Sequence, residues 1–315
     1  MTPTKTALEG NTLPEHRTPL STTALLRLQA ERNRQTRGLR HSFASHRERM
    51  MELIQSAGRL FPGPGRPSIT VLGAGNCLDL DLKVLGGQFD LVRLVDIDQN
   101  AVEYGVEAQL GISNSVRIIA PMDLAAPLAS LVANDVETAD ACESVCLQLA
   151  HTLPILPTEP TDVVVSACAL SQIMESLAQL IPADHPAFLD FLQALRRGHL
   201  RRMLQLLKPN GCGVFVTDLV SSETAPELSA TDIAQLPRFL AKCLLTSNFF
   251  SGLNPGLVLQ DLKTEPVLAE FCRNVQIHPP WQWHLGPRSY AVYAVDFRSA
   301  ALPHTELTIR NGVPS

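Results

Sequence analysis

Two apolar runs with unusual ends constrain this chain more than any other feature. The first, residues 68–72, is rich in β-branched side chains and leads directly into Gly73 and Gly75. The second, residues 91–95, ends on Asp96. Short apolar runs of this kind are typical of buried strands in an open parallel sheet. Glycines at the end of such a strand permit a sharp turn close to a ligand, and an acid after the next strand accepts hydrogen bonds from a ribose diol. The pattern predicts a site for an adenosine-containing ligand.

Segments typical of strands and helices alternate from residue 68 onward. We expect strands over residues 68–72, 90–95, 115–120, 162–166 and 213–218, and a closing strand pair over 274–284 and 289–297. We expect helices to begin near residue 78, to cover 99–110, 123–151 and 186–207, and to fill most of 224–273, with Pro186 at the first position of its helix. Strands separated by helices predict an α/β fold with a doubly wound, mostly parallel sheet.

The N-terminal region differs from the rest in charge. Residues 1–67 carry 11 Lys and Arg against 5 Asp and Glu, whereas residues 68–315 carry 15 against 26. Apolar and arginine spacing over 22–56 predicts two helical pieces interrupted near Gly38, with a basic surface that either docks on the chain itself or binds an anionic partner. We therefore divide the chain into a disordered tail (1–20), a basic helical extension with a linker (21–66), the main α/β domain (67–300) and a C-terminal tail (301–315).

Composition places the chain among soluble globular proteins, with 45% hydrophobic and 18% charged residues. Its apolar runs fall short of the roughly 18 residues of a membrane span, and its N-terminus lacks the basic and apolar regions of a signal peptide. The seven cysteines form no Cys-x-x-Cys pair, so we expect reduced thiols and no metal site. These features predict a cytoplasmic protein with no membrane partner.

Three details separate the adenosine cofactors that this opening could bind. A dinucleotide fingerprint needs a third glycine for close packing of helix on strand, and Leu78 stands at that position, which argues against NAD. Asp123 follows the third expected strand, where an acid can meet an adenine amino group. The expected order of elements ends with a long helix, the turn at residues 208–211, one strand and a closing strand pair.

In this order and spacing, residues 68–297 resemble a class I S-adenosylmethionine-dependent methyltransferase, and the segment from Phe43 to Arg47 resembles that of a bacterial subgroup. The resemblance implies a seven-stranded, Rossmann-like sheet. It also implies cofactor contacts from Gly73, Ala74, Gly75, Asn76, Asp96, Ile97, Asp98, Asp123, Leu124, Ser166 and Ala167. Two departures stand out: Val71 replaces the usual acid before the glycines, and Cys77 replaces their third glycine. Asp79 is a candidate for the missing acid.

Methyl transfer depends chiefly on alignment of the reacting groups, and a general base is needed only when the nucleophile must lose a proton. Candidate catalytic groups are His284, His185 and Asp218, although a lone histidine is more often a capping or packing residue. Residues 166–172 lack the Asn/Asp-Pro-Pro-aromatic tetrapeptide of enzymes that methylate base amines, and we expect Cys168 in this segment to be structural.

Candidate substrate-binding residues are Arg47 in the basic extension and Trp281, Trp283 and Tyr290 in the closing strand pair. Packing within the fold would explain the aromatic residues equally well. The sequence thus predicts S-adenosylmethionine-dependent methylation of a small molecule, with the acceptor and the oligomeric state left open. The alternatives are an NAD(P)-dependent oxidoreductase, a non-catalytic S-adenosylmethionine-binding protein, and an RNA or protein methyltransferase that uses the basic arm.

Overall fold

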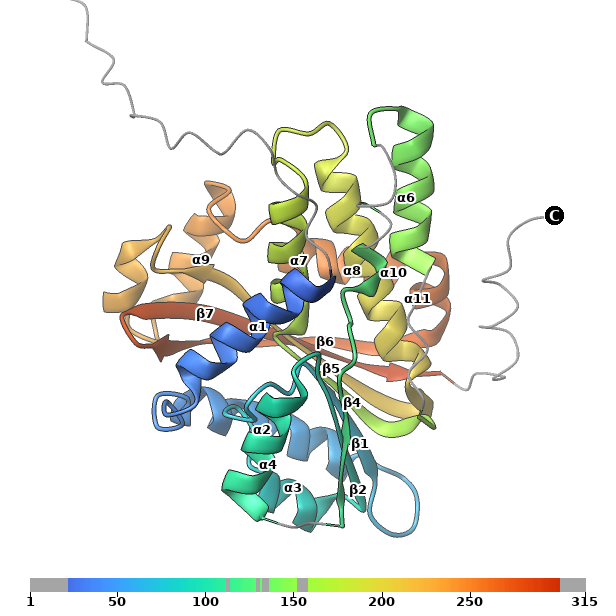
Figure 1. Cartoon of the computed structure of the whole chain (residues 1–315), viewed down its shortest axis with the longest axis vertical. Coiled ribbons are helices and arrows are strands. Elements are labelled where there is room, and N and C mark those ends of the chain that lie inside the picture. The colour runs from blue at the N-terminus through green and yellow to red at the C-terminus, as the bar shows by residue number, and fades with distance from the viewer. Residues whose placement is uncertain (1–21, 112–113, 129–130, 132–135, 152–157, 301–315) are drawn as a thin grey trace, which may run out of the picture.

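The computed structural model describes residues 22–300 except 112–113, 129–130, 132–135 and 152–157, so the two predicted tails lie outside the described residues. In this part of the chain, seven strands form one sheet in the order β3-β2-β1-β4-β5-β7-β6 (Figure 1). The strands are β1 (Ser68–Leu72), β2 (Leu91–Val95), β3 (Val116–Ile119), β4 (Thr161–Ala167), β5 (Leu207–Ser221), β6 (Cys272–Leu285) and β7 (Arg288–Ser299). Strands β1 to β5 are parallel, and β7 runs antiparallel to β5 and β6. The predicted fold class is confirmed.

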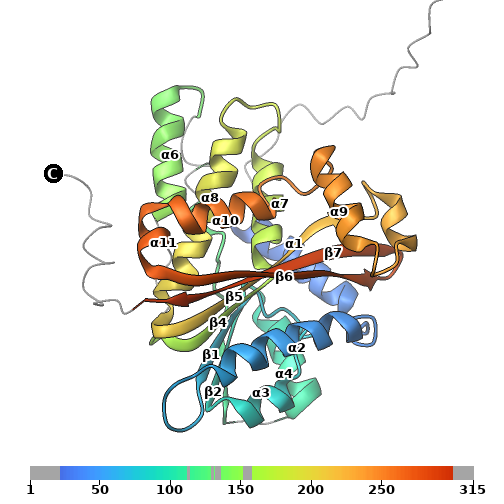
Figure 2. The same ribbon diagram turned by 180° about the vertical axis from the view of Figure 1, so that it is seen from behind.

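Helices cover both faces of the sheet (Figures 1 and 2). The described helices are α1 (Thr22–Thr36), α2 (Ala44–Arg59), α3 (Leu82–Gln88), α4 (Gln99–Leu110), η1 (Ala126–Leu128), α6 (Ala139–His151), α7 (Ala169–Leu180), α8 (Phe188–Gln205), η2 (Pro226–Ala230), α9 (Leu236–Leu245), α10 (Pro255–Thr264) and α11 (Pro266–Phe271). In the described chain, none of them combines the length and apolar character that crossing a bilayer requires.

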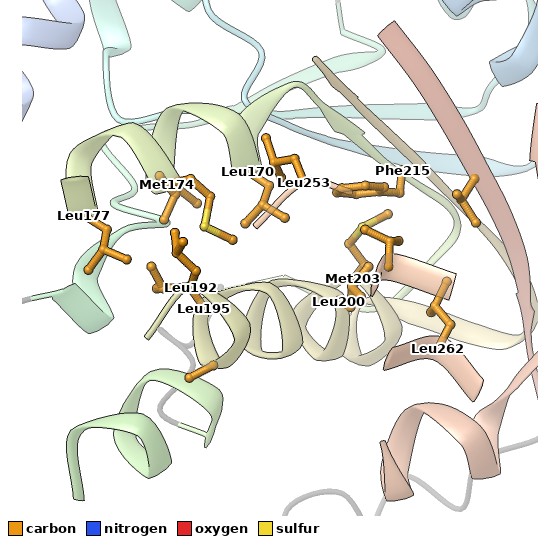
Figure 3. Packing of buried hydrophobic residues seen from close by; sticks show 14 of the residues in the cluster. Leu170, Met174, Leu177, Leu192, Leu195, Leu200, Met203, Phe215, Leu253 and Leu262 are labelled. Carbon is orange, nitrogen blue, oxygen red and sulfur yellow. The ribbon is translucent and has the colours of Figure 1, made fainter. Parts of the chain in front are cut away.

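Strand side chains alternate between two cores, one on each face. On β4, Val164 belongs to the core built with α7 and α8, whereas Val163 and Val165 belong to the core built with α2 and α3. Successive side chains of a strand point to opposite faces, so a central strand covered on both sides is apolar throughout. Figure 3 shows the first core, in which Leu170, Met174 and Leu177 face α8. The continuous apolar runs in the sequence follow from this double coverage.

The N-terminal helices pack on the body of the protein. Met50 and Ile54 of α2 are fully buried in the second core, and Figure 2 shows α2 lying across that face of the sheet. Helix α1 crosses near the carboxyl ends of the strands (Figure 1). The two helical pieces predicted for residues 22–56 are present, with the break at residues 37–43.

Several local predictions were wrong. The helix expected from about residue 78 begins only at Leu82, and β5 begins at Leu207, so it includes the residues 208–211 that were expected to form a turn. Residues 123–151 are not one helix, since η1 and α6 are separate and the Thr138 hydroxyl accepts the Ala141 N–H at the start of the second. Helix α7 was missed: Cys168, in the left-handed region at φ 51°, turns the chain directly from β4 into this helix. Pro186 lies before α8, which begins at Phe188. Local chain reversals of this kind leave little trace in apolar periodicity.

Candidate active site

The glycine loop lies at the carboxyl end of β1, against the end of β4. Gly73 and Gly75 both have positive φ, 79° and 46°. A Cβ atom on Gly73 would lie 2.9 Å from the Cβ of Ala169 and 3.1 Å from the carbonyl oxygen of Ala167. Gly73 therefore meets two requirements at once, a left-handed backbone and a close approach that leaves no room for a side chain.

Asp96, at the end of β2, holds this loop in place. Its carboxylate accepts the Gly75 N–H at 2.7 Å and the Asp98 N–H at 2.9 Å. Burial raises the pKa of Asp96 to about 6, although these backbone donors act in the opposite direction. Each carboxylate oxygen keeps a second lone pair that can accept a ligand hydroxyl. Asp98 is instead engaged within the protein, because it caps α4 and accepts the Asn33 side-chain amide at 2.9 Å.

A recess opens beside Asp96, at the ends of β2 and β3. It is lined by residues that include Gly73, Asp96, Ile97, Met122, Asp123 and Leu124. The Asp123 carboxylate accepts the Ala125 N–H at 2.8 Å, and burial raises the pKa of Asp123. The recess thus combines apolar walls with two acids, which suits a flat base and its ribose.

The main cavity, of about 630 Å³, begins at the same loop and shares Gln29, Gly73 and Gln172 with the recess. Its walls come from α1, α2, the glycine loop, α7, the ends of β4 and β5, and the β6–β7 hairpin. Ala74, Gly75 and Ala167 line it close to the loop. This volume lies in the range of pockets that enclose small organic ligands.

Two hydrogen-bond acceptors face the main cavity just after the glycine loop. Asn76 is 5% exposed, and its Nδ2 donates to the Asn33 carbonyl oxygen at 2.6 Å, while its Oδ1 lacks a hydrogen-bond partner within the described chain. Asp79 also lines the cavity, and burial raises its pKa to about 7. A buried acceptor without a donor is unfavourable. A cationic donor in the cavity would satisfy Asn76 Oδ1 and would favour the ionised form of Asp79.

Asp218 lies at the end of β5 and lines the cavity beyond the loop. It accepts hydrogen bonds from Ser171 Oγ at 3.2 Å and Trp283 Nε1 at 3.4 Å. Burial raises the pKa of Asp218 to about 6. Cys168 Sγ lies 3.9 Å from the same carboxylate, and burial keeps the pKa of its thiol well above the usual value, so this cysteine stays protonated.

An aromatic wall adjoins Asp218 and consists of Phe43, His46, Trp283 and Tyr290, all of which line the cavity. Trp283 stacks on His46 with ring centroids 4.8 Å apart and on Tyr290 at 5.1 Å, and Phe43 contacts it at 4.7 Å. His46 Nδ1 accepts the Trp281 indole N–H at 3.0 Å, and burial lowers the pKa of His46 to about 3. The histidine in this wall is therefore neutral.

Several predicted site residues lie elsewhere in the fold. The Ser166 hydroxyl pairs with His199 Nε2 at 2.8 Å on the α8 side of the sheet. His185 Nδ1 accepts the Ala187 N–H at the start of α8, and His284 is exposed with Nδ1 2.8 Å from Ser289 Oγ. Among the described residues, the linings of the recess and of the main cavity include neither histidine.

Two predicted substrate-binding residues support the wall and the loop from behind. Trp281 is 5% exposed and contacts His46, as described above. The Arg47 guanidinium donates to the Leu78 carbonyl oxygen at 2.7 Å, so it braces the segment that follows the glycine loop. In the described structure, the lining of the cavity includes neither residue.

The sequence analysis missed the part of α1 and α7 that lines the cavity. Gln29, Arg32 and Asn33 of α1 and Ser171 and Glu175 of α7 all reach it, and Arg32 forms an ion pair with Glu175 between the two helices. The arginine periodicity of residues 22–56 indicated a basic helical face but not its contact. A pairing between residues so far apart in sequence leaves no local signal.

Comparison with known proteins finds no matching family model and no match among curated proteins. Solved structures do align with the chain. The N-methyltransferase NodS from Bradyrhizobium japonicum, in complex with S-adenosylhomocysteine, is 14% identical with a TM-score of 0.37, covering 80% of this chain and 86% of its own. The magnesium protoporphyrin IX methyltransferase ChlM from Synechocystis, also with bound S-adenosylhomocysteine, is 11% identical with a TM-score of 0.42, covering 83% and 84%.

Proposed function

We propose that the protein is an S-adenosylmethionine-dependent methyltransferase with a small-molecule acceptor. One observation carries the proposal: the recess beside Asp96 and the main cavity meet at the glycine loop, so a nucleoside in the recess would direct its other end into the cavity. Asp96 would bind the ribose diol, and Asp123 with Leu124 would flank the adenine. The cofactor supplies an electrophilic methyl group on a sulfonium. The protein's own contribution is to bind, orient and exclude water.

Asp79 and the unpartnered Oδ1 of Asn76 are the residues that we assign to the α-ammonium group of the cofactor's methionine part. Val71 cannot serve, because it is a buried apolar side chain of β1. Asp79, eight residues further along, would take the place of the missing carboxylate, since the chain after Gly73 stays non-helical long enough to bring Asp79 to the cavity.

The same segment argues against a dinucleotide cofactor. A bound pyrophosphate needs a helix N-terminus directly after the glycine loop. Here α3 begins only at Leu82, and its first free N–H groups, of Lys83 and Val84, already donate to the Asp81 carboxylate at 3.1 Å. The carboxylate of Asp79 would also repel a pyrophosphate.

The basic arm is occupied by contacts with the protein itself, which argues against a nucleic-acid acceptor. Arginines of α1, α2 and the turn between them contact acids, carbonyl oxygens or an aromatic ring of the chain: Arg32, Arg34, Arg37, Arg40, Arg47 and Arg49. An RNA-binding arm would present such side chains to phosphates, and its affinity would fall steeply with salt. We expect only weak RNA binding by the full chain, measured by fluorescence anisotropy across a salt series.

Calorimetric titration of the full-length protein with S-adenosylmethionine, S-adenosylhomocysteine and NAD, run in parallel, tests the proposal. We expect micromolar binding of the first two and none of NAD. Binding of NAD alone would identify an oxidoreductase instead. Tight S-adenosylmethionine binding with no methyl transfer in a broad acceptor screen would support the non-catalytic alternative.

Asp96→Ala provides the matched variant for this titration. It removes the carboxylate that receives the ribose diol and also the acceptor of the Gly75 N–H, so we expect cofactor affinity to fall at least about 100-fold. Circular dichroism should show the native fold retained. Unchanged affinity in this variant would contradict the ribose assignment.

A further inference from the structure

The charged side chains that line the main cavity divide into internal pairs and isolated acids. Arg32 pairs with Glu175, and Arg288 pairs with Glu223. Both cavity arginines are therefore already neutralised by cavity glutamates. The acids without a salt bridge among the described residues are Asp79, which is assigned above to the cofactor and lies in the field of Arg47 and Arg40, and Asp218.

Asp218 is surrounded by neutral donors only. Ser171 and Trp283 donate hydrogen bonds to it, and the Cys168 thiol lies near it, while no Lys, Arg or His of the described residues forms a salt bridge with it. Asp218 is partly buried. Neutral donors stabilise a carboxylate but do not compensate its charge, and a charge withdrawn even partly from water is costly without a partner of opposite sign. The missing partner of Asp218 is a positive charge.

The surface next to Asp218 is suited to a cation with an apolar body. Phe43 and Tyr290 are partly exposed and offer electron-rich rings to the cavity, whereas Trp283 is buried between His46 and Tyr290 and holds the wall together. The stacked His46 is neutral, so the wall contributes no positive charge. Aromatic faces attract ammonium groups. Further apolar lining comes from Phe188, Leu192, Phe250 and Leu253.

We propose that the acceptor part of the cavity takes an organic amine, bound as its ammonium with the nitrogen at Asp218 and its apolar body against the wall of Phe43, Trp283 and Tyr290. Methylation of this nitrogen requires that one ammonium proton first pass to the Asp218 carboxylate, which frees the nitrogen lone pair. This inference rests on the proposed function, because it assigns the other part of the site to the cofactor. Anionic acceptors are disfavoured by the same charges, since each cavity arginine already has a carboxylate partner and a further acid, Asp218, faces the cavity.

Three probes test the charge preference: phenethylamine, 2-phenylethanol and 3-phenylpropionate. Each has a phenyl ring and two methylene groups, and they differ only in the terminal group, which is an ammonium, a hydroxyl or a carboxylate. Each is titrated by calorimetry into the full-length protein saturated with S-adenosylhomocysteine. We expect the ammonium to bind at least about tenfold more tightly than the carboxylate, with the alcohol between them. Equal affinities, a preference for the carboxylate, or no ammonium binding below about 10 mM would overturn the inference.

Two variants locate the effect. Asp218→Asn should remove the preference for the ammonium while leaving S-adenosylhomocysteine affinity unchanged, which also verifies that the variant is folded. Glu223→Gln frees Arg288 and should raise carboxylate affinity without weakening ammonium binding. An ammonium preference that survives Asp218→Asn would refute the assignment.

The experiments distinguish failure of the cofactor assignment from failure of the amine inference. If S-adenosylhomocysteine does not bind, the cofactor assignment is wrong, and the probes are then titrated into the protein alone, where the ammonium preference still stands or falls with Asp218. If S-adenosylhomocysteine binds and the probes show no preference, the cofactor assignment survives and the amine inference is lost.

Discussion

Replacing Asp79 by Asn should stabilise the protein and weaken its cofactor binding. Burial raises the pKa of Asp79 from 3.8 to about 7. In the unfolded chain this carboxyl ionises near its ordinary pKa, so wild-type stability falls as the pH rises from about 4 to 7 and then levels off. Three pKa units correspond to about 4 kcal/mol, and because the side chain faces an open cavity, we expect water to reduce this to about 2 kcal/mol.

The assay is urea unfolding of wild type and Asp79→Asn at about pH 4 and pH 8, followed by calorimetry with S-adenosylmethionine. The two proteins should be equally stable in acid, whereas the variant should be more stable at the higher pH. Its cofactor affinity should fall about 10- to 100-fold, because one charge-assisted contact with the ammonium is lost. Asp232→Asn, at an exposed acid, is the control and should change neither quantity. A variant with wild-type affinity, or with no pH-dependent gain in stability, would refute the reasoning.

Gly73→Ala should cost more stability than Gly111→Ala, by at least about 1 kcal/mol in urea unfolding, because both have positive φ but only at Gly73 would a Cβ meet neighbouring atoms. Only Gly73→Ala should also weaken S-adenosylhomocysteine binding, and equal effects of the two would contradict the close-packing argument. Trp283→Phe should raise the pKa of Asp218, since the indole N–H that lowers it is lost, and should shift phenethylamine binding to higher pH. Trp281→Phe, whose N–H contacts His46 instead, should leave that pH profile unchanged, and identical profiles for both variants would argue against Asp218 as the titrating group.

Strand positions could be predicted from the sequence because burial on both faces makes a strand apolar without interruption. Residues 68–72 and 99–110 match β1 and α4 to the residue. The glycine loop and its acid were predictable for the same reason, since Gly73 and Asp96 follow directly from strand ends. Parallel strands bring those ends to one edge of the sheet, so sequence order alone places them together.

The acceptor part of the site could not be predicted in the same way. Its walls join α1 and α2 to the β6–β7 hairpin, as in the contact of Phe43 with Trp283, and such contacts depend on packing rather than on local pattern. Residue type alone indicated the wrong histidines as candidate bases, because a histidine can act as a base or as a structural hydrogen-bond partner. His185 and His284 are ordinary candidate bases, yet His185 accepts the Ala187 N–H just before α8 and His284 contacts the buried Ser289. His46, which lines the cavity, is held neutral.

Three acids of the site share one property, a pKa raised by burial. Asp79, Asp96 and Asp218 each have a pKa raised by burial, so each makes the folded protein less stable as it ionises. Three such groups around one cavity system would be a poor arrangement for a structural core, where apolar residues of similar volume are at least as stable. The arrangement suits ligands that bring positive charge and hydroxyl donors, because their binding offsets the desolvation of the carboxylates. Ligand binding should therefore stabilise the fold more at about pH 8, above the raised pKa values of all three acids, than in acid.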